Sequence, residues 1–168
     1  ERSIYLYSGI TRIKKVDQMS YCFIDNLPEY EKRLKQYGQK IIHQDFNIRN
    51  MCIDVKEWKL KVYDWEFIDK KNPLMDLVDF LLSLSSAFIT SSFIKKVIQT
   101  YHDTLYLYGD SRRISDIEEQ MYYNIQKYAA TRMNMYLLFY CKAKKSYIER
   151  IYYNIFLLTK ALEKGSVR

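Results

Sequence analysis

The sequence predicts an α+β domain that is mainly helical, with one small β-hairpin embedded in the helical body. The 168 residues include only 4 Gly and 2 Pro, and 48% of them are hydrophobic, which excludes collagen-like, linker-like and disordered chains. Apolar residues at 74, 77, 78, 81 and 82 fall on one face of a helix. Two short β-like runs, Met51–Val55 and Lys59–Tyr63, are joined by Lys56–Trp58, a connection that suits a hairpin. The length of residues 1–168 fits a single domain.

Start and stop signals predict the helices on both sides of this hairpin. Pro28 suits the first position of a short helix from Leu27, and Gly38 suits its end. Asn72 and Pro73 form a cap and first turn for a helix that continues to about Phe88. Further helices are expected from Ser91 or Ser92 to Gly109, from the capping box Ser115–Glu118 toward Cys141, and from about Ser146 to Lys164 before Gly165.

Charge and cysteine content limit the partners and the compartment. The net charge is +7, but its basic pairs, such as Lys70/Lys71 and Arg112/Arg113, are scattered as on solvated helix faces. A nucleic-acid surface would cluster them beside stacking aromatics, so nucleic acid is not an expected partner. The three cysteines have no CxxC spacing and suit reduced thiols. With no signal peptide and no apolar stretch of about 18 residues, we expect a cytoplasmic protein without a membrane span.

The residues around the hairpin carry the side chains best suited to chemistry. Asn50 precedes the first β-like run and Asp64 follows the second. If the hairpin is regular and centred on Glu57, these two residues face each other at about 5 Å and can share a Mg²⁺ ion. Asp45 would project from the preceding loop as a carboxylate able to accept a proton from a hydroxyl, which is the equipment for phosphoryl transfer. A shift of register by one residue would break this geometry.

The pattern H-x-D-x-x-x-x-N at residues 43–50, followed by D-W-E at residues 64–66, resembles the catalytic core of the aminoglycoside phosphotransferase and choline kinase superfamily. The continuation N-P-L-M-D-L at residues 72–77 is also similar to this family, and the resemblance extends from residue 41 to about 82. It implies a protein-kinase-like carboxy-terminal lobe whose hairpin carries the catalytic and metal-binding loops. Only 42 residues precede His43 and they contain no glycine-rich loop, so we expect the amino-terminal ATP-clamping lobe to be absent from residues 1–168.

The resemblance implies a role for individual residues. Asp45 is the expected catalytic residue, which orients and deprotonates the acceptor hydroxyl. Asn50 and Asp64 are the expected Mg²⁺ ligands. Arg49 is unusual beside such a metal site and is a candidate for contact with a phosphate, with a surface salt bridge as the alternative. The expected supporting residues are His43, Glu66 and Asp76.

Together these features predict that the parent protein is an ATP- and Mg²⁺-dependent kinase of a small hydroxyl-bearing molecule. Its partners would be a nucleoside triphosphate and an acceptor such as choline or another amino alcohol, a sugar or an aminoglycoside. A non-catalytic kinase-like binding or scaffold module is the alternative, because the ATP-clamping lobe is missing. A basic helical nucleic-acid binder is a third hypothesis that depends only on the net charge. No residue after the D-W-E segment is diagnostic of the acceptor.

Overall fold

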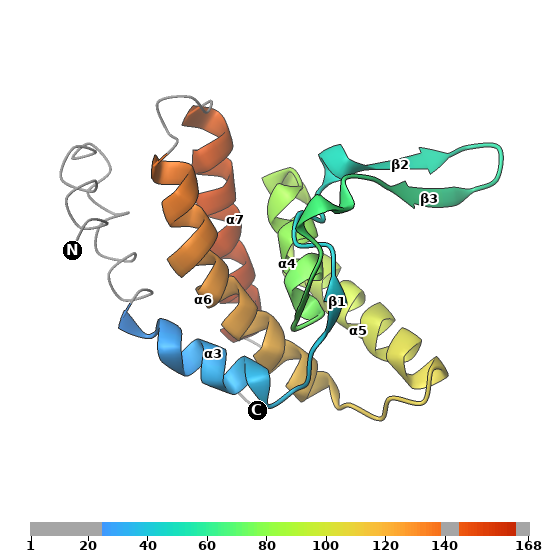
Figure 1. The fold of residues 1–168 in the computed structure, drawn as a ribbon, viewed down its shortest axis with the longest axis horizontal. Coiled ribbons are helices and arrows are strands. Elements are labelled where there is room, and N and C mark those ends of the chain that lie inside the picture. The colour runs from blue at the N-terminus through green and yellow to red at the C-terminus, as the bar shows by residue number, and fades with distance from the viewer. Residues whose placement is uncertain (1–24, 139–144, 164–168) are drawn as a thin grey trace.

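The protein folds into a bundle of helices from which a two-stranded hairpin projects (Figure 1). The structure is a computed structural model and describes residues 25–138 and 145–163. Cys22, Cys141 and the expected helix stop at Gly165 lie outside these ranges. The described helices and strands are α3 (Leu27–Lys35), β1 (Lys40–Ile42), β2 (Met51–Asp54), β3 (Lys59–Val62), β4 (Asp69–Lys71), α4 (Leu74–Ser83), α5 (Ser91–Leu107), α6 (Ile114–Leu138) and α7 (Lys145–Glu163). This arrangement confirms the mainly helical α+β class.

The hydrophobic core forms where α4 packs against the three helices that follow it. Leu74, Val78, Leu81 and Leu82 of α4 are fully buried, on the face that their spacing predicts. Their partners come from α5, α6 and α7 and include Ile98, Ile117, Met121, Ile125, Ile151, Ile155 and Leu158. Within the described residues, no helix combines the length and hydropathy that crossing a membrane would require. Packing of this apolar face fixes the rotation of α4 and therefore the direction of its polar side chains.

Strands β1 and β4 form a short antiparallel sheet that the sequence analysis did not predict. Lys40 pairs with Lys71, and Ile42 pairs with Asp69. The strands are only three residues long, Lys-Ile-Ile and Asp-Lys-Lys, which is too short for a periodic signal. Their pairing is nevertheless important, because the loop after β1 and the segment before β4 contain the proposed site. The sheet therefore holds together the two ends of this region.

The β2–β3 hairpin has a different register from the one expected. Met51 pairs with Val62, and Asp54 pairs with Lys59. Asn50 therefore lies opposite Tyr63, whose backbone N–H donates to the Asn50 carbonyl at 2.8 Å. The expectation that Asn50 faces Asp64 is wrong. The hairpin is centred between Lys56 and Glu57 and not on Glu57 itself.

The connection between the two strands explains this register. One oxygen of Asp54 accepts hydrogen bonds from the backbone N–H groups of Lys56 and Glu57, at 3.0 and 3.3 Å. The other oxygen accepts from Lys61 Nζ at 2.6 Å. Trp58 adopts a positive φ of 51° and completes the turn before β3. These contacts stabilise a four-residue connection, whereas the sequence analysis assumed three residues.

Several helix ends also differ from the expected positions. Helix α4 stops at Ser83, where the Asn154 side chain of α7 donates to the carbonyls of Leu82 and Leu84 at 3.0 Å each. A separate 3₁₀ turn, Ser86–Phe88, follows where the helix was expected to continue. The cap of α5 is Thr90 and not Ser91 or Ser92, and α6 begins at Ile114, where Asp116 accepts from the Arg113 N–H in place of the expected Ser115 box.

Candidate active site

The loop between β1 and β2 is anchored by His43, which is 1% exposed. The backbone N–H of Asp45 donates to His43 Nδ1 at 3.2 Å, so this nitrogen is an acceptor. The other ring nitrogen, Nε2, then carries the proton and donates to the Tyr63 carbonyl at 2.6 Å. The ring also contacts Trp65, with the ring centroids 4.7 Å apart. The loop between β1 and β2 carries the expected catalytic residue, Asp45, and is called the catalytic-type loop. His43 therefore links this loop to the segment that contains Asp64.

Asp76 of α4 holds the same loop from the opposite side. Its carboxylate oxygens accept hydrogen bonds from the backbone N–H groups of His43 and Gln44, at 2.7 and 2.9 Å. Gln44 adopts a positive φ of 65°, a conformation that costs free energy unless its surroundings stabilise it. Its side chain supplies such contacts, donating to the Phe67 carbonyl and accepting from Lys71. The loop therefore turns sharply just before Asp45.

The carboxylate of Asp45 is oriented by two amide side chains of its own loop. Asn50 Nδ2 donates to Asp45 Oδ2 at 2.7 Å, and Asn47 Nδ2 donates to Asp45 Oδ1 at 3.0 Å. Both amides also donate to the Asp45 backbone carbonyl. These contacts fix the orientation of the Asp45 carboxylate, and a general base must lie within hydrogen-bond reach of the proton it removes.

Asp64 follows β3 directly and adopts a left-handed backbone conformation with φ of 63°. Aspartate tolerates this region better than most residues. Tyr63 connects the neighbouring backbone to Asn50 and to His43, so the chain brings Asp64 to the base of the hairpin beside the loop. Within the described part of the chain, the Asp64 carboxylate is exposed and accepts no hydrogen bond.

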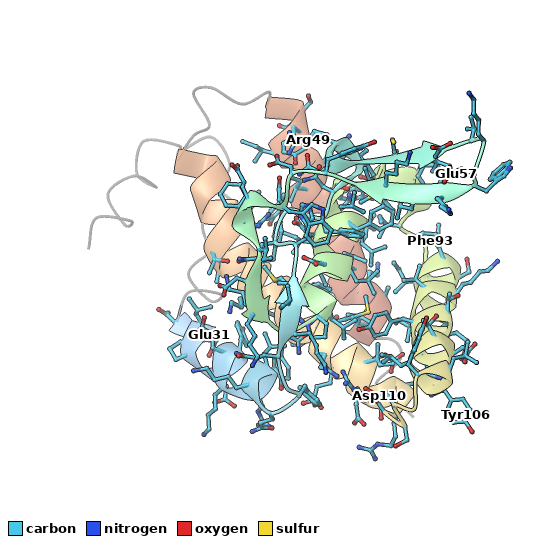
Figure 2. The ribbon with its side chains drawn as sticks, turned by 45° about the vertical axis from the view of Figure 1, so that its right-hand side comes forward. Glu31, Arg49, Glu57, Phe93, Tyr106 and Asp110 are labelled. Atoms are coloured by element: carbon cyan, nitrogen blue, oxygen red, sulfur yellow. The ribbon has the colours of Figure 1, made fainter. Side chains whose placement is uncertain are left out.

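Arg49 and Glu66 are placed differently from the other predicted residues. Arg49 is exposed at the base of the hairpin, while Glu57 lies at its tip (Figure 2). The Arg49 Nε atom donates to Asn47 Oδ1 at 3.3 Å, and its guanidinium lies 5.4 Å from the centroid of the Tyr147 ring. Glu66 is exposed and, among the described residues, forms no hydrogen bond or ion pair. Arg49 therefore has a defined position, whereas Glu66 has no supporting contact with any residue that the structure describes.

The sequence analysis missed two residues that contact the site, Asp79 and Arg132. Arg132 Nη1 lies 3.0 Å from Asp79 Oδ2 and 3.4 Å from Asp45 Oδ1. Burial raises the pKa of Asp79 to about 6; Arg132 opposes this rise, whereas the negative charges of Asp45 and Asp76 add to it. Asp79 has a weak sequence signal, because it lies one helical turn after Asp76. Arg132 has none, because only the packing of α6 brings it to the loop.

The two expected metal ligands at the base of the hairpin have side chains whose chemistry suits a magnesium ion. Asn50 uses its Nδ2 group to contact Asp45, and no described residue donates to its Oδ1 atom. That oxygen and the Asp64 carboxylate are hard ligands of the kind that Mg²⁺ prefers. Among the described residues, no three His, Cys, Asp or Glu side chains are grouped as a metal site. A site with two protein ligands suits Mg²⁺, which usually keeps waters and substrate phosphates in its coordination sphere.

The fold and the site together define a mainly helical lobe that holds a loop carboxylate beside a β-hairpin. Residues 15–113 match the family model of the phosphotransferase enzyme family (APH), which is more than half of the chain. The chain belongs to this family, which confirms the resemblance inferred from the sequence motifs. No curated protein and no solved structure matches the chain. The matched residues include the loop, the hairpin and α4, whereas α6 and α7 lie beyond them.

Proposed function

We propose that the intact protein transfers the γ-phosphoryl group of ATP to a hydroxyl group of a small molecule. The observation that carries this proposal is the arrangement around Asp45, whose carboxylate is fixed by Asn50 while the Asn50 Oδ1 atom remains without a donor among the described residues. The proposed base, Asp45, and the proposed metal ligand, Asn50, are therefore adjacent. Membership of a phosphotransferase family supports the same reaction class.

In this mechanism Asp45 accepts the proton of the acceptor hydroxyl as its oxygen attacks the γ-phosphorus. The bond to the ADP leaving group breaks as the new P–O bond forms, so the products are the phosphorylated acceptor and ADP. Asn50 and Asp64 would hold Mg²⁺, which when bound neutralises negative charge on the phosphates. His43 and Asp76 would keep the loop in position. Catalysis would depend mainly on positioning and electrostatic stabilisation.

The hairpin surface supports the proposal that this lobe works together with a second one. Ile53 and Leu60 face each other across the β2–β3 ladder and are 61% and 56% exposed. Val55 and Trp58, at the tip, are exposed as well. An exposed apolar patch of this kind marks an interaction site more often than ordinary surface. We propose that an ATP-clamping lobe covers this apolar patch. We also propose that the active protein is cytoplasmic.

The first prediction tests Asp45 as the catalytic residue in the intact protein. Asp45→Asn keeps the shape of the side chain but removes the proton acceptor, so we expect phosphoryl transfer to fall by at least about 100-fold. Affinity for Mg²⁺–ATP, measured by calorimetry, should remain within about threefold because Asp45 is not a proposed ligand. Transfer is measured as ADP release with amino alcohols, sugars and aminoglycosides as acceptors.

Asp103→Asn is the matched control, since Asp103 is an exposed carboxylate on α5. Its transfer rate should equal that of the unmodified protein. Undiminished turnover by Asp45→Asn would reject the role of this residue. Tight Mg²⁺–ATP binding without transfer to any acceptor in the panel would instead favour the non-catalytic kinase-like module.

A further inference from the structure

The guanidinium of Arg132 lies between two carboxylates that come from different parts of the chain. Its Nη1 atom is 3.0 Å from Asp79 on α4 and 3.4 Å from Asp45 on the catalytic-type loop. Arg132 belongs to α6 and follows Asp45 by 87 residues. It lies outside residues 15–113, so the family match assigns it no role.

Three features fix the position of the Arg132 side chain. Its neighbour Met133 is buried in the hydrophobic core, so packing places the backbone at this point. Asp79 is 4% exposed and needs a charged partner, since a buried carboxylate without one is strongly destabilising. Arg132 also lies beside the Tyr128 ring, at 6.0 Å from its centroid. The guanidinium is therefore held in place independently of Asp45.

The contact with Arg132 differs in kind from the other contacts of the Asp45 carboxylate. Asn47 and Asn50 belong to the same loop and move with it. Among the described residues, Arg132 is the side chain that connects this carboxylate to the helical core. Without the guanidinium, two carboxylates would also lie close together with no cation between them, and their repulsion would push Asp45 away.

We propose that Arg132 is a positioning residue for Asp45, and that Asp79 anchors Arg132 in the required orientation. The inference rests on the proposed phosphotransferase function, in which Asp45 is the base. Helix α6, beyond the matched family region, thereby controls the geometry of the catalytic-type loop. Arg132 itself touches neither the substrate nor the metal in this scheme.

The test compares Arg132→Ala with Arg113→Ala in the intact protein. Arg113 is a matched control, because it is an arginine on the solvent side near the start of α6 that pairs with Asp116 at 2.8 Å. With ATP hydrolysis as the assay, Arg132→Ala should lower kcat by about 10- to 100-fold, the loss expected from a displaced catalytic group, and leave the KM for ATP unchanged. Arg132→Lys, or free guanidinium at a non-denaturing millimolar concentration, should restore part of kcat, and urea should not.

A second measurement does not depend on activity. The side-chain amide NMR signals of Asn50, which donates to Asp45, should shift in Arg132→Ala and stay in place in Arg113→Ala. Unchanged Asn50 signals would overturn the proposal whatever the kinetics show. A loss of kcat that neither lysine nor guanidinium restores would assign Arg132 to packing and would overturn it as well. If the unmodified protein neither hydrolyses ATP nor transfers its γ-phosphoryl group, the proposed function fails separately, and the Asn50 signals alone decide whether Arg132 positions Asp45.

Discussion

Asp79 shows how a single buried carboxylate can serve the site at a cost to stability. It anchors Arg132, but its burial raises its pKa from 3.8 to about 6. Between pH 3.8 and about pH 6, Asp79 therefore binds a proton more readily in the native state than in the unfolded state. Because the group must ionise in a buried position as the pH rises, its contribution to the free energy of unfolding falls by about 3 kcal/mol between pH 4 and 7.

This sign leads to a prediction for Asp79→Asn. The asparagine does not titrate, so the free energy of unfolding of the variant, relative to the unmodified protein, should rise between pH 4 and 7. The change with pH is the quantity to measure, by urea denaturation at several pH values, because loss of the Arg132 ion pair adds a separate offset. In Asp103→Asn the same difference should stay flat above pH 4, since His102 and Gln99 lower the pKa of exposed Asp103. A flat profile for Asp79→Asn would contradict the prediction.

Helix α5 illustrates the element scale, where local sequence signals found the helix but misplaced its cap. The hydroxyl of Thr90 accepts a hydrogen bond from the Phe93 N–H at 3.2 Å. Ser91 and Ser92 have equally suitable side chains, so composition alone does not choose among the three hydroxyl residues. The choice follows from the preceding 3₁₀ turn, which delivers Thr90 in the extended conformation that a cap requires.

The cap predicts a measurable effect at this scale. Thr90→Ala should lower the free energy of unfolding by about 1 kcal/mol, because one N–H group of the first turn loses its partner. Thr104→Ala is the matched control in the same helix, where the hydroxyl donates to the Thr100 carbonyl and caps nothing. That variant should be neutral or slightly stabilising, since alanine is the better helix former. Equal destabilisation by both changes would argue against Thr90 as the cap.

At the scale of the whole molecule, Asn154 connects α7 to α4, the helix that carries Asp76 and Asp79. Its side chain is completely buried and donates to the carbonyls of Leu82 and Leu84 at 3.0 Å each. Helix α7 therefore holds the C-terminal end of α4 through two hydrogen bonds. These two hydrogen bonds join residues 72 and 70 positions apart, so they stabilise the tertiary arrangement and not a local element.

Asn154→Leu should lower the free energy of unfolding by about 2–4 kcal/mol, because two buried carbonyls lose their donor. Urea denaturation of the intact protein measures the change. Gln99→Leu is the control, since Gln99 is an exposed amide on α5 with a hydrogen bond to Asp103. It should change stability by less than about 0.5 kcal/mol. A comparable loss in both variants would show that the Asn154 contact has no special importance.

The sequence by itself determined the features that depend on neighbouring residues. The spacing of Leu74, Val78 and Leu82 predicted the buried face of α4, and the His43–Asn50 pattern predicted the family. It did not determine the pairing of Asn50, because a single extra residue in the connection shifts every partner across the ladder. It also could not bring Arg132 to Asp45, since that contact requires α6 to pack against α4. Only the tertiary structure decides such contacts, because they form between distant segments that the hydrophobic core holds together.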